Sequence, residues 1–358
     1  MLTDTLARLQ SADRAIAGRV ADHLDQLTKP PGSLGRLESL AITLATITGE
    51  ELPRVTPPGV LVFAADHGVA AEGVSAFPQA VTAQMVGNFV AGGAAINVFA
   101  RQIGARLEVI DVGVVSELSR DSAARGGESG LVHDKVRRGT ANFAEQDAMQ
   151  RSEAVQAIEV GIRAAERAVA AGCRCLIVGE MGIANTTASS AMLAVLTGEP
   201  VEGLTGQGTG IPESRLAHKQ AVIERAIEAR APDPQDPLDI LSKLGGLEIA
   251  AMAGAYLGGA SRQVPLLVDG FIATVAALLA CRIEPKVRDY LIFGHRSREP
   301  GHEHALMALG GEPLLELELR LGEGTGAALA FPLLEAATRM LADMATFDSA
   351  GVAGSQAT

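Results

Sequence analysis

The chain has 358 residues, of which 47% are hydrophobic and 20% are charged, a composition that provides a substantial core and excludes general disorder. Its formal net charge is −12 and no basic stripe is interleaved with aromatic residues, which argues against nucleic acid as a partner. Asp4 stands where a signal peptide carries bases, Asp269 and Gly270 break the longest apolar run, and cysteine is scarce, so we expect a cytoplasmic protein without membrane contact.

The two ends of the chain are expected to pack together. A helix predicted over residues 4–27 ends before the helix-breaking sequence Lys29-Pro30-Pro31-Gly32, and a second helix is predicted over residues 331–344. We expect residues 1–28 and 331–350 to form a small helical subdomain beside a large α/β domain over residues 29–330. Residues 351–358 are expected to be a flexible tail.

Between these ends, short apolar runs alternate with alanine-rich stretches that have helical spacing. The helical stretches include residues 153–171 and 247–257, and the apolar runs span residues 60–65, 107–112, 175–179, 264–268 and 290–293. Continuous apolarity predicts strands that are covered on both faces. The fold class we expect is therefore α/β, with a doubly wound, mostly parallel sheet flanked by helices.

Each predicted strand is followed by glycine together with an acidic residue or histidine. Because ligands of such folds bind beyond the carboxyl ends of the strands, we expect these tails to converge on one rim. The tails are residues 66–68, 111–113, 179–182, 269–271 and 294–295.

Two glycine-rich stretches are candidates for binding an anion. In residues 179–187 a strand leads into a helix that Asn185 or Thr186 is expected to cap, and the free N–H groups at its start suit a phosphate. In residues 205–210 the backbone N–H groups can surround an anion, with Lys219 as a point charge. An ordinary strand-to-helix turn and a flexible connector are the respective alternatives.

A third stretch, residues 320–326, places Glu323 between two glycines. A carboxylate on such open backbone reaches a bound ligand easily, which a general base needs together with some desolvation. A solvated glutamate in a turn is the alternative.

Histidines raise a metal site as a further alternative. His67 follows a predicted strand, and three more histidines lie within residues 295–304. Their spacing matches no zinc pattern such as His-Glu-x-x-His, so we favour hydrogen-bonding roles and expect no metal and no cofactor.

Taken together, these stretches resemble the nicotinate-nucleotide:dimethylbenzimidazole phosphoribosyltransferase family of cobalamin lower-ligand assembly, from Leu27 to Ala337. The matching segments are residues 29–38, 65–69, 72–74, 81–83, 109–113, 179–187, 267–271 and 320–328. The resemblance implies transfer of ribose 5-phosphate from nicotinate mononucleotide to 5,6-dimethylbenzimidazole or a related base, giving the α-linked product and nicotinate. It also implies a homodimer.

The family's reaction implies roles residue by residue. Glu323 would be the catalytic base that takes the N–H proton of the benzimidazole, and Glu180 a second carboxylate that orients the base or supports Glu323. The nucleotide and its phosphate would be held by Gly182, Asn185, Thr186, Gly206, Gly208, Lys219, Asp269, Gly270 and Ser297. The aromatic base would lie near Phe77, Met85, Met181 and Leu321.

Two other functions compete with this one. A metal-dependent hydrolase would use Asp66, His67 and the histidines of residues 295–304, whereas a catalytically idle nucleotide sensor would not need Glu323. The chain contains no Asp-Asp pair of the kind that transferases of pyrophosphorylated ribose use, which agrees with a mononucleotide donor.

Overall fold

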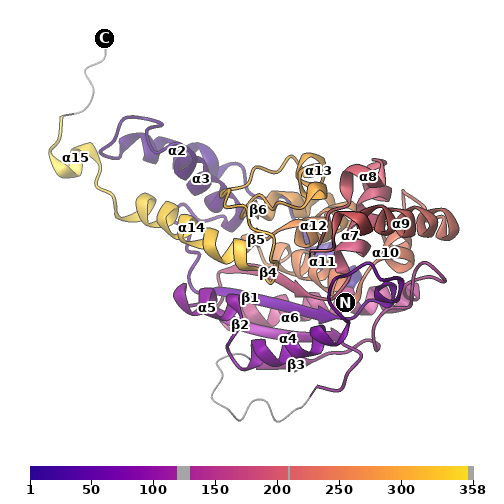
Figure 1. The fold of residues 1–358 in the computed structure, drawn as a ribbon. Coiled ribbons are helices and arrows are strands. Elements are labelled where there is room, and N and C mark those ends of the chain that lie inside the picture. Colours follow the sequence, from indigo (N-terminus) through magenta and orange to yellow (C-terminus); the bar gives the residue numbers. More distant parts are fainter. Residues whose placement is uncertain (119–129, 209, 354–358) are drawn as a thin grey trace.

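The computed structural model describes residues 1–118, 130–208 and 210–353 of the chain. Most of the predicted tail, residues 354–358, therefore lies outside the described residues, as does Thr209 of the second glycine-rich stretch. The described part contains one sheet of six parallel strands in the order β3-β2-β1-β4-β5-β6 (Figure 1). The strands are β1 (Pro58–Ala65), β2 (Arg106–Gly113), β3 (Gly130–His133), β4 (Cys175–Met181), β5 (Leu266–Val268) and β6 (Leu291–Phe293).

The strand order confirms the predicted doubly wound α/β fold. The chain builds the sheet outward from β1 to β3, returns to the centre, and then builds outward from β4 to β6. The order thus reverses between β1 and β4, the position at which Rossmann-like folds bind their ligands. Only the short β3 had no counterpart among the predicted strands. It lies at the edge and is half exposed, so it lacks the continuous apolarity of a buried strand.

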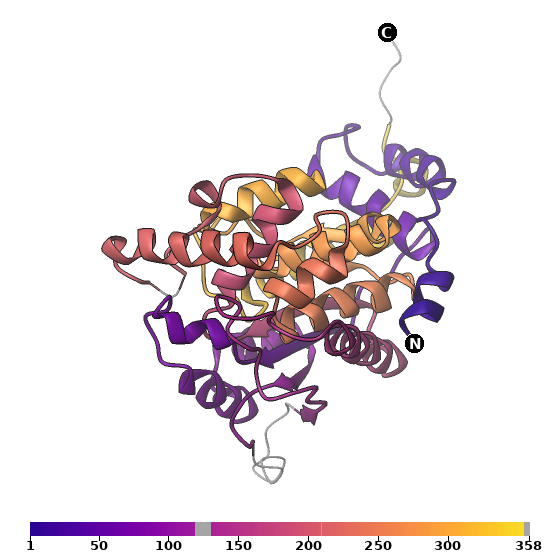
Figure 2. The same cartoon turned by 90° about the vertical axis from the view of Figure 1, so that its right-hand side faces the viewer.

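Helices cover both faces of the sheet. One face packs against α6, α11 and α12, and the other packs against α4, α5 and α14. Figure 2 shows the helices of the second half of the chain, coloured red to orange, massed on one side of the purple strands. The helices are α1 (Leu2–Arg8), α2 (Ile16–Gln26), α3 (Arg36–Thr48), α4 (Ala80–Val90), α5 (Ala95–Gln102), α6 (Arg151–Ala170), α7 (Asn185–Thr197), α8 (Val201–Leu204), α9 (Leu216–Arg230), α10 (Pro237–Leu244), α11 (Leu247–Ala260), α12 (Phe271–Ile283), α13 (Pro300–Leu309), α14 (Thr325–Asp343) and α15 (Phe347–Ala350), with 3-10 turns at Gly68–Glu72, Glu213–Arg215 and Pro285–Tyr290.

The two ends of the chain meet, as predicted. In Figure 1, α2 and α3 lie beside α14, and the backbone N–H of Thr28 donates to the carbonyl of Ala345 at 2.9 Å. The single helix predicted over residues 4–27 is wrong, because the chain leaves helical geometry at Leu9. The carboxylate of Asp289 accepts the N–H of Ala12 there, which holds the connecting segment against a 3-10 turn. The division into two domains at residue 28 stays a prediction.

One stretch, residues 80–102, is long and apolar enough to cross a membrane by length and composition. It consists of two helices, α4 and α5, separated by residues 91–94. Val86, Phe89 and Ile96 are fully buried in the core that these helices share with the sheet. The stretch therefore belongs to the interior of the α/β domain.

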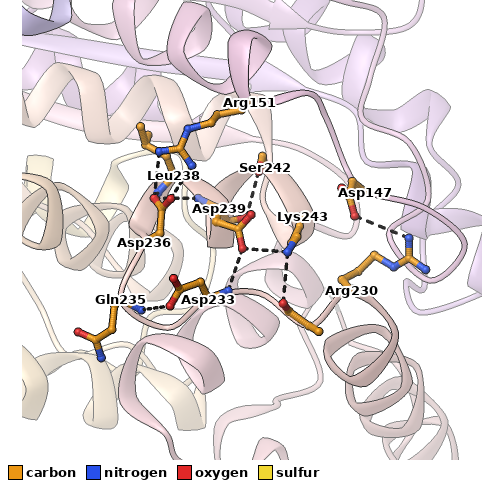
Figure 3. A network of polar contacts seen from close by, with 11 residues as sticks. Asp147, Arg151, Arg230, Asp233, Gln235, Asp236, Leu238, Asp239, Ser242 and Lys243 are labelled. Carbon is orange, nitrogen blue, oxygen red and sulfur yellow. Dashed lines mark hydrogen bonds and ion pairs between the residues drawn. The ribbon is translucent and has the colours of Figure 1, made fainter.

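A polar network fixes the start of α10 on the outside of the molecule (Figure 3). Asp236 caps α10 by accepting the backbone N–H groups of Leu238 and Asp239 at 3.0 and 3.2 Å. The same carboxylate accepts two hydrogen bonds from Arg151 of α6, at 2.6 and 3.2 Å. Asp239 in turn pairs with Lys243 at 2.9 Å and accepts the backbone N–H of Asp233 at 2.8 Å. Asp236 and Asp239 thus each contact one cation and at least one backbone N–H group.

Candidate active site

A cavity of about 320 Å³ lies at the carboxyl ends of β4, β5 and β6. The residues that line it come from the strand tails, from the starts of α7 and α12, from α4 and the turn before it, and from the loops before α9, α13 and α14. They are Phe77, Val81, Met85, Glu180, Met181, Gly182, Ile183, Asn185, Thr186, Gly208, Asp269, Gly270, Phe271, Ile272, Ala273, His295, Ser297, Glu299, Arg320, Leu321, Gly322 and Glu323. Three of the five predicted tails therefore meet at one cavity, and the tails of β1 and β2 do not line it.

The side chains that follow β1 make hydrogen bonds to neighbouring parts of the fold and not to the cavity. His67 Nε2 lies 2.5 Å from Glu248 Oε1, and both side chains are fully buried. Asp66 accepts the N–H of Val115 at 2.7 Å. Among the described residues, no group of three or more histidines, cysteines or acids is placed to hold a metal ion.

His302 illustrates the hydrogen-bonding role that we expected of the histidines. Its Nδ1 accepts the backbone N–H of Ser297 at 2.8 Å, and its Nε2 pairs with the hydroxyl of Thr274 at 3.0 Å. Burial, followed by the field of His295, lowers the pKa of His302 to about 3. The ring is therefore neutral, and it braces the loop that carries Ser297.

Glu323 lies on a turn in which three successive residues have left-handed backbone conformations. The φ angles of Gly322, Glu323 and Gly324 are 88°, 63° and 89°. For a residue with a Cβ this conformation costs about 1–2 kcal/mol, so other contacts must hold the turn in place. The side chain is only 5% exposed and faces the cavity, which excludes the alternative of a solvated glutamate.

The environment of Glu323 suits a base. Its Oε2 accepts the backbone N–H of Ile96, at the start of α5, at 3.4 Å. Burial raises the pKa of Glu323 to about 6, and the nearby charge of Asp269 acts in the same direction. The carboxyl group is therefore mostly ionised at neutral pH but close to the pKa at which a general base works best.

Asp269 holds this turn. Its two carboxylate oxygens accept the backbone N–H groups of Gly324 and Ala327, at 3.2 and 2.9 Å. Asp269 thus caps the first turn of α14, and the helix begins at Thr325 instead of the predicted residue 331. Close packing adds to the restraint, since a Cβ on Gly179 would lie 2.2 Å from the carbonyl oxygen of Glu323. Both contacts fix where the Glu323 side chain projects.

Glu180 is another carboxyl group that lines the cavity. Its carboxyl group accepts hydrogen bonds from the side-chain amide of Asn185 and from the backbone N–H of Glu323. Burial, and then the charge of Glu248, raises the pKa of Glu180 to about 8 despite these donors. At neutral pH Glu180 is therefore mostly protonated, whereas Glu323 is mostly ionised.

The start of α7 differs from our prediction. No side chain caps this helix, and its N-cap is Ala184 with a φ of 76°. Asn185 binds Glu180 instead, and Thr186 accepts a hydrogen bond from Lys219 at 2.9 Å. The predicted capping by Asn185 or Thr186 is wrong because both side chains are used in the cavity wall.

Lys219 lies behind the cavity wall and does not line the cavity. Its ammonium group is fully buried and also donates to the carbonyl of Gly206 at 3.1 Å. Burial lowers the pKa of Lys219 to about 8, although the charge of Glu299 partly offsets that effect. Gly206 likewise stays outside the lining, whereas Gly208 and Ser297 belong to it.

The other side of the cavity is apolar. Phe77 and Leu321 are 51% and 59% exposed and stand at the opening, while Met85 and Met181 lie deeper and are half-buried. Sequence reasoning named these four. It missed Val81, Ile183, Ile272 and Ala273 of the apolar wall, and it assigned no contact with either substrate to Glu299 or Arg320. Those two charged residues lay close in the chain to the histidine cluster and to Glu323.

A parallel sheet with a mostly apolar cavity at the carboxyl ends of β4, β5 and β6, where the carboxyl groups of Glu323 and Glu180 differ in protonation, is typical of an enzyme that acts on a small molecule. A sequence profile of phosphoribosyltransferases matches residues 9–352. The nicotinate-nucleotide–dimethylbenzimidazole phosphoribosyltransferase of Chloroflexus aggregans is 52% identical over 352 residues, 98% of each chain. That of Roseiflexus sp. is 51% identical over 354 residues, 99% of this chain and 98% of its own.

A solved structure gives the same result. The crystal structure of CobT from Thermus thermophilus matches with a TM-score of 0.90 and 50% identity, and the match covers 95% of this chain and 100% of that chain. The chain therefore belongs to the nicotinate-nucleotide–dimethylbenzimidazole phosphoribosyltransferase family, the family that its motifs predicted.

Proposed function

We propose that this enzyme moves ribose 5-phosphate from nicotinate mononucleotide to 5,6-dimethylbenzimidazole or a related base, for synthesis of the cobalamin nucleotide loop. The observation that carries the proposal is the buried carboxylate of Glu323, with its pKa raised to about 6, on the wall of a cavity that has an apolar half. The names of the relatives supply the two substrates.

Glu323 acts as the general base. One ring nitrogen of the benzimidazole attacks C1′ of the ribose, and the N–H proton of the other nitrogen passes to the Glu323 carboxylate. The electron pair of the C1′–N bond returns to the nicotinate ring, which leaves from the opposite face as a neutral pyridine. Because attack and departure occur on opposite faces, the β-linked nucleotide becomes an α-linked one, and no acid or metal assists the leaving group.

Glu180 acts as the neutral partner of this base. Two carboxyl groups whose surroundings push their pKa values apart take different roles, here about 6 for Glu323 and about 8 for Glu180. The protonated Glu180 donates its O–H to an acceptor of the bound substrates, and it accepts from Asn185 and the Glu323 backbone. It thereby orients the aromatic base and supports the Glu323 turn.

Different parts of the cavity bind the phosphate, the sugar and the aromatic base. The phosphate binds beyond the start of α7, where Gly182, Thr186, Gly208 and Ser297 line the cavity and the helix dipole favours an anion. Lys219 and Gly206 support that subsite from behind, and Asn185, Asp269 and Gly270 border the sugar. The aromatic base lies among Phe77, Met85, Met181 and Leu321.

The proposal extends to a cytoplasmic homodimer that needs no metal, on the strength of the family resemblance. Sedimentation of the purified protein tests the oligomeric state.

Incubation with nicotinate mononucleotide and a panel of bases, followed by mass analysis, tests the activity. Release of nicotinate with formation of the α-linked riboside phosphate supports the proposal, and the panel ranks the bases. Release of nicotinate without base transfer, or no release at all, would reject it.

A further inference from the structure

Glu299 is an acid at the place proposed for the phosphate. It follows Ser297 in the loop between β6 and α13, it is 9% exposed, and it lines the cavity. Its Oε2 has no hydrogen-bond partner among the described residues. A Cβ on Gly206 would lie 2.1 Å from that oxygen, so the carboxyl group packs directly on the glycine-rich loop.

The groups around Glu299 are those that would bind an anion. The backbone N–H of Gly208 donates to its carboxylate, and Lys219 from α9 and Arg320 from the segment before α14 act on it as positive charges. A Cβ on Gly208 would lie 3.3 Å from Nζ of Lys219, which places that ammonium group within reach of the same loop. Glu299 therefore occupies the position of an internal counter-ion to Lys219.

An ionised Glu299 opposes a phosphate dianion. The two negative groups would share Lys219 and the loop N–H groups, and because Glu299 is buried, like charges repel there more strongly than in solution. Burial already raises the pKa of Glu299 in the absence of a ligand, and an incoming dianion raises it further. A protonated carboxyl group would instead donate its O–H to a phosphate oxygen.

We propose that Glu299 takes up a proton from solvent when the phosphate monoester binds, so that it changes from the counter-ion of Lys219 to a hydrogen-bond donor to the phosphate. The inference rests on the proposed function, since it deepens the role of the phosphate subsite. Linkage then requires the nucleotide affinity to fall as pH rises, by up to about tenfold per pH unit while one proton is taken up.

Other titrating groups limit the pH window of the test. Lys219 lies nearest and has a pKa of about 8, and Glu323 and Glu180 in the same cavity have pKa values of about 6 and about 8. Arg320 is the other cation that acts on Glu299. A phosphate monoester has its second pKa near 6. Between about pH 6.5 and about pH 7.5, Lys219 is mostly charged and the phosphate is mostly a dianion.

The test counts protons by calorimetry of the full chain in two buffers of different ionisation enthalpy. The probes are nicotinate mononucleotide, its riboside without the phosphate, and inorganic phosphate. We expect wild type to take up a proton with both phosphate probes but not with the riboside. Glu299→Gln should lose that uptake, and its nucleotide Kd should change less with pH than that of wild type. Glu299→Asp keeps the titrating group and should keep the uptake.

Glu303→Gln is the matched control, because Glu303 lies in the first turn of α13, just after Glu299, but is 62% exposed and pairs with Arg296. It should behave like wild type. Equal proton uptake in wild type and Glu299→Gln would overturn the inference, as would weaker binding by Glu299→Gln at every pH with an unchanged Tm. Product formation by wild type with no Glu299-linked uptake rejects the inference alone. If wild type takes up a Glu299-linked proton when it binds inorganic phosphate but forms no product, the proposed function alone is rejected.

Discussion

Two groups of acids in this molecule have opposite surroundings. In the cavity, burial raises the pKa values of Glu323 and Glu180, and no cation pairs directly with either carboxyl group among the described residues. At the start of α10, Asp236 has Arg151 and two backbone N–H groups, and the hydrogen bond with Arg151 leads the causes that lower its pKa (Figure 3).

The direction of the pKa shift indicates whether an acid serves proton transfer or the stability of the fold. An acid whose pKa is lowered by partners stabilises the folded state when ionised, whereas an acid whose pKa is raised by burial is held at a cost that the rest of the fold must offset. Glu323 and Glu180 are therefore available for proton transfer, because no paired cation in the described part of the chain offsets the cost of burying their charge. The variants below test how far turnover and stability are separated between the two groups.

The largest effect is expected for Glu323→Gln. The amide keeps the size and the contact with the N–H of Ile96 but cannot take a proton, so kcat should fall about 10²–10⁴-fold with substrate binding retained. Steady-state kinetics with calorimetric binding measure both.

Glu318→Gln is the control for that variant. Glu318 also has a left-handed φ, 56°, but its side chain is 76% exposed and pairs with Arg298. Its removal should leave kcat unchanged. Near-normal turnover of Glu323→Gln would mean that another group accepts the proton.

Lys219→Met should act on the nucleotide. The thioether fills most of the buried space, but the charge and the hydrogen bonds to Thr186 and Gly206 are lost, so KM for the mononucleotide should rise about 10–100-fold. The KM for the base should change little. A rise in both, together with a lower Tm, would indicate that Lys219 only holds the loop to α7.

Gly322→Ala should test the contact between the two cavity acids. A Cβ at this position would lie 2.2 Å from Oε1 of Glu180, and the φ of 88° adds strain. We expect a loss of stability above the roughly 1–2 kcal/mol of the left-handed conformation alone, with reduced turnover. Gly310→Ala supplies the comparison, because Gly310 has a φ of 58° and open space around it. Equal effects of the two variants on stability and turnover would show that the Glu180 contact is unimportant.

Sequence alone predicted the features that are local in the chain. Continuous apolar runs predicted the parallel sheet, and flanking glycines singled out Glu323, since both signals lie within a few residues of the feature itself. Features that depend on tertiary geometry were missed or mistaken. Asp269 caps α14 from 55 residues away. Asn185 donates to Glu180, five residues earlier in the chain, instead of capping its own helix, because the strand-to-helix turn brings both side chains to the cavity.

The smallest effect is expected in the network of Figure 3, where Asp236→Asn removes the ion pair with Arg151. Asparagine is as good an N-cap as aspartate, so the cap of α10 is retained and the loss of stability at pH 7 should be below about 1 kcal/mol. Because the folded pKa of Asp236 is lowered, its contribution is present above the unfolded pKa and is lost as pH falls through the folded pKa. Urea denaturation of wild type and variant should therefore differ at neutral pH and converge in strong acid or high salt. Asp236→Ala, which also removes the cap, should lose about 1 kcal/mol more, and a difference between wild type and Asp236→Asn that persists in strong acid would show that Asp236 acts without its charge.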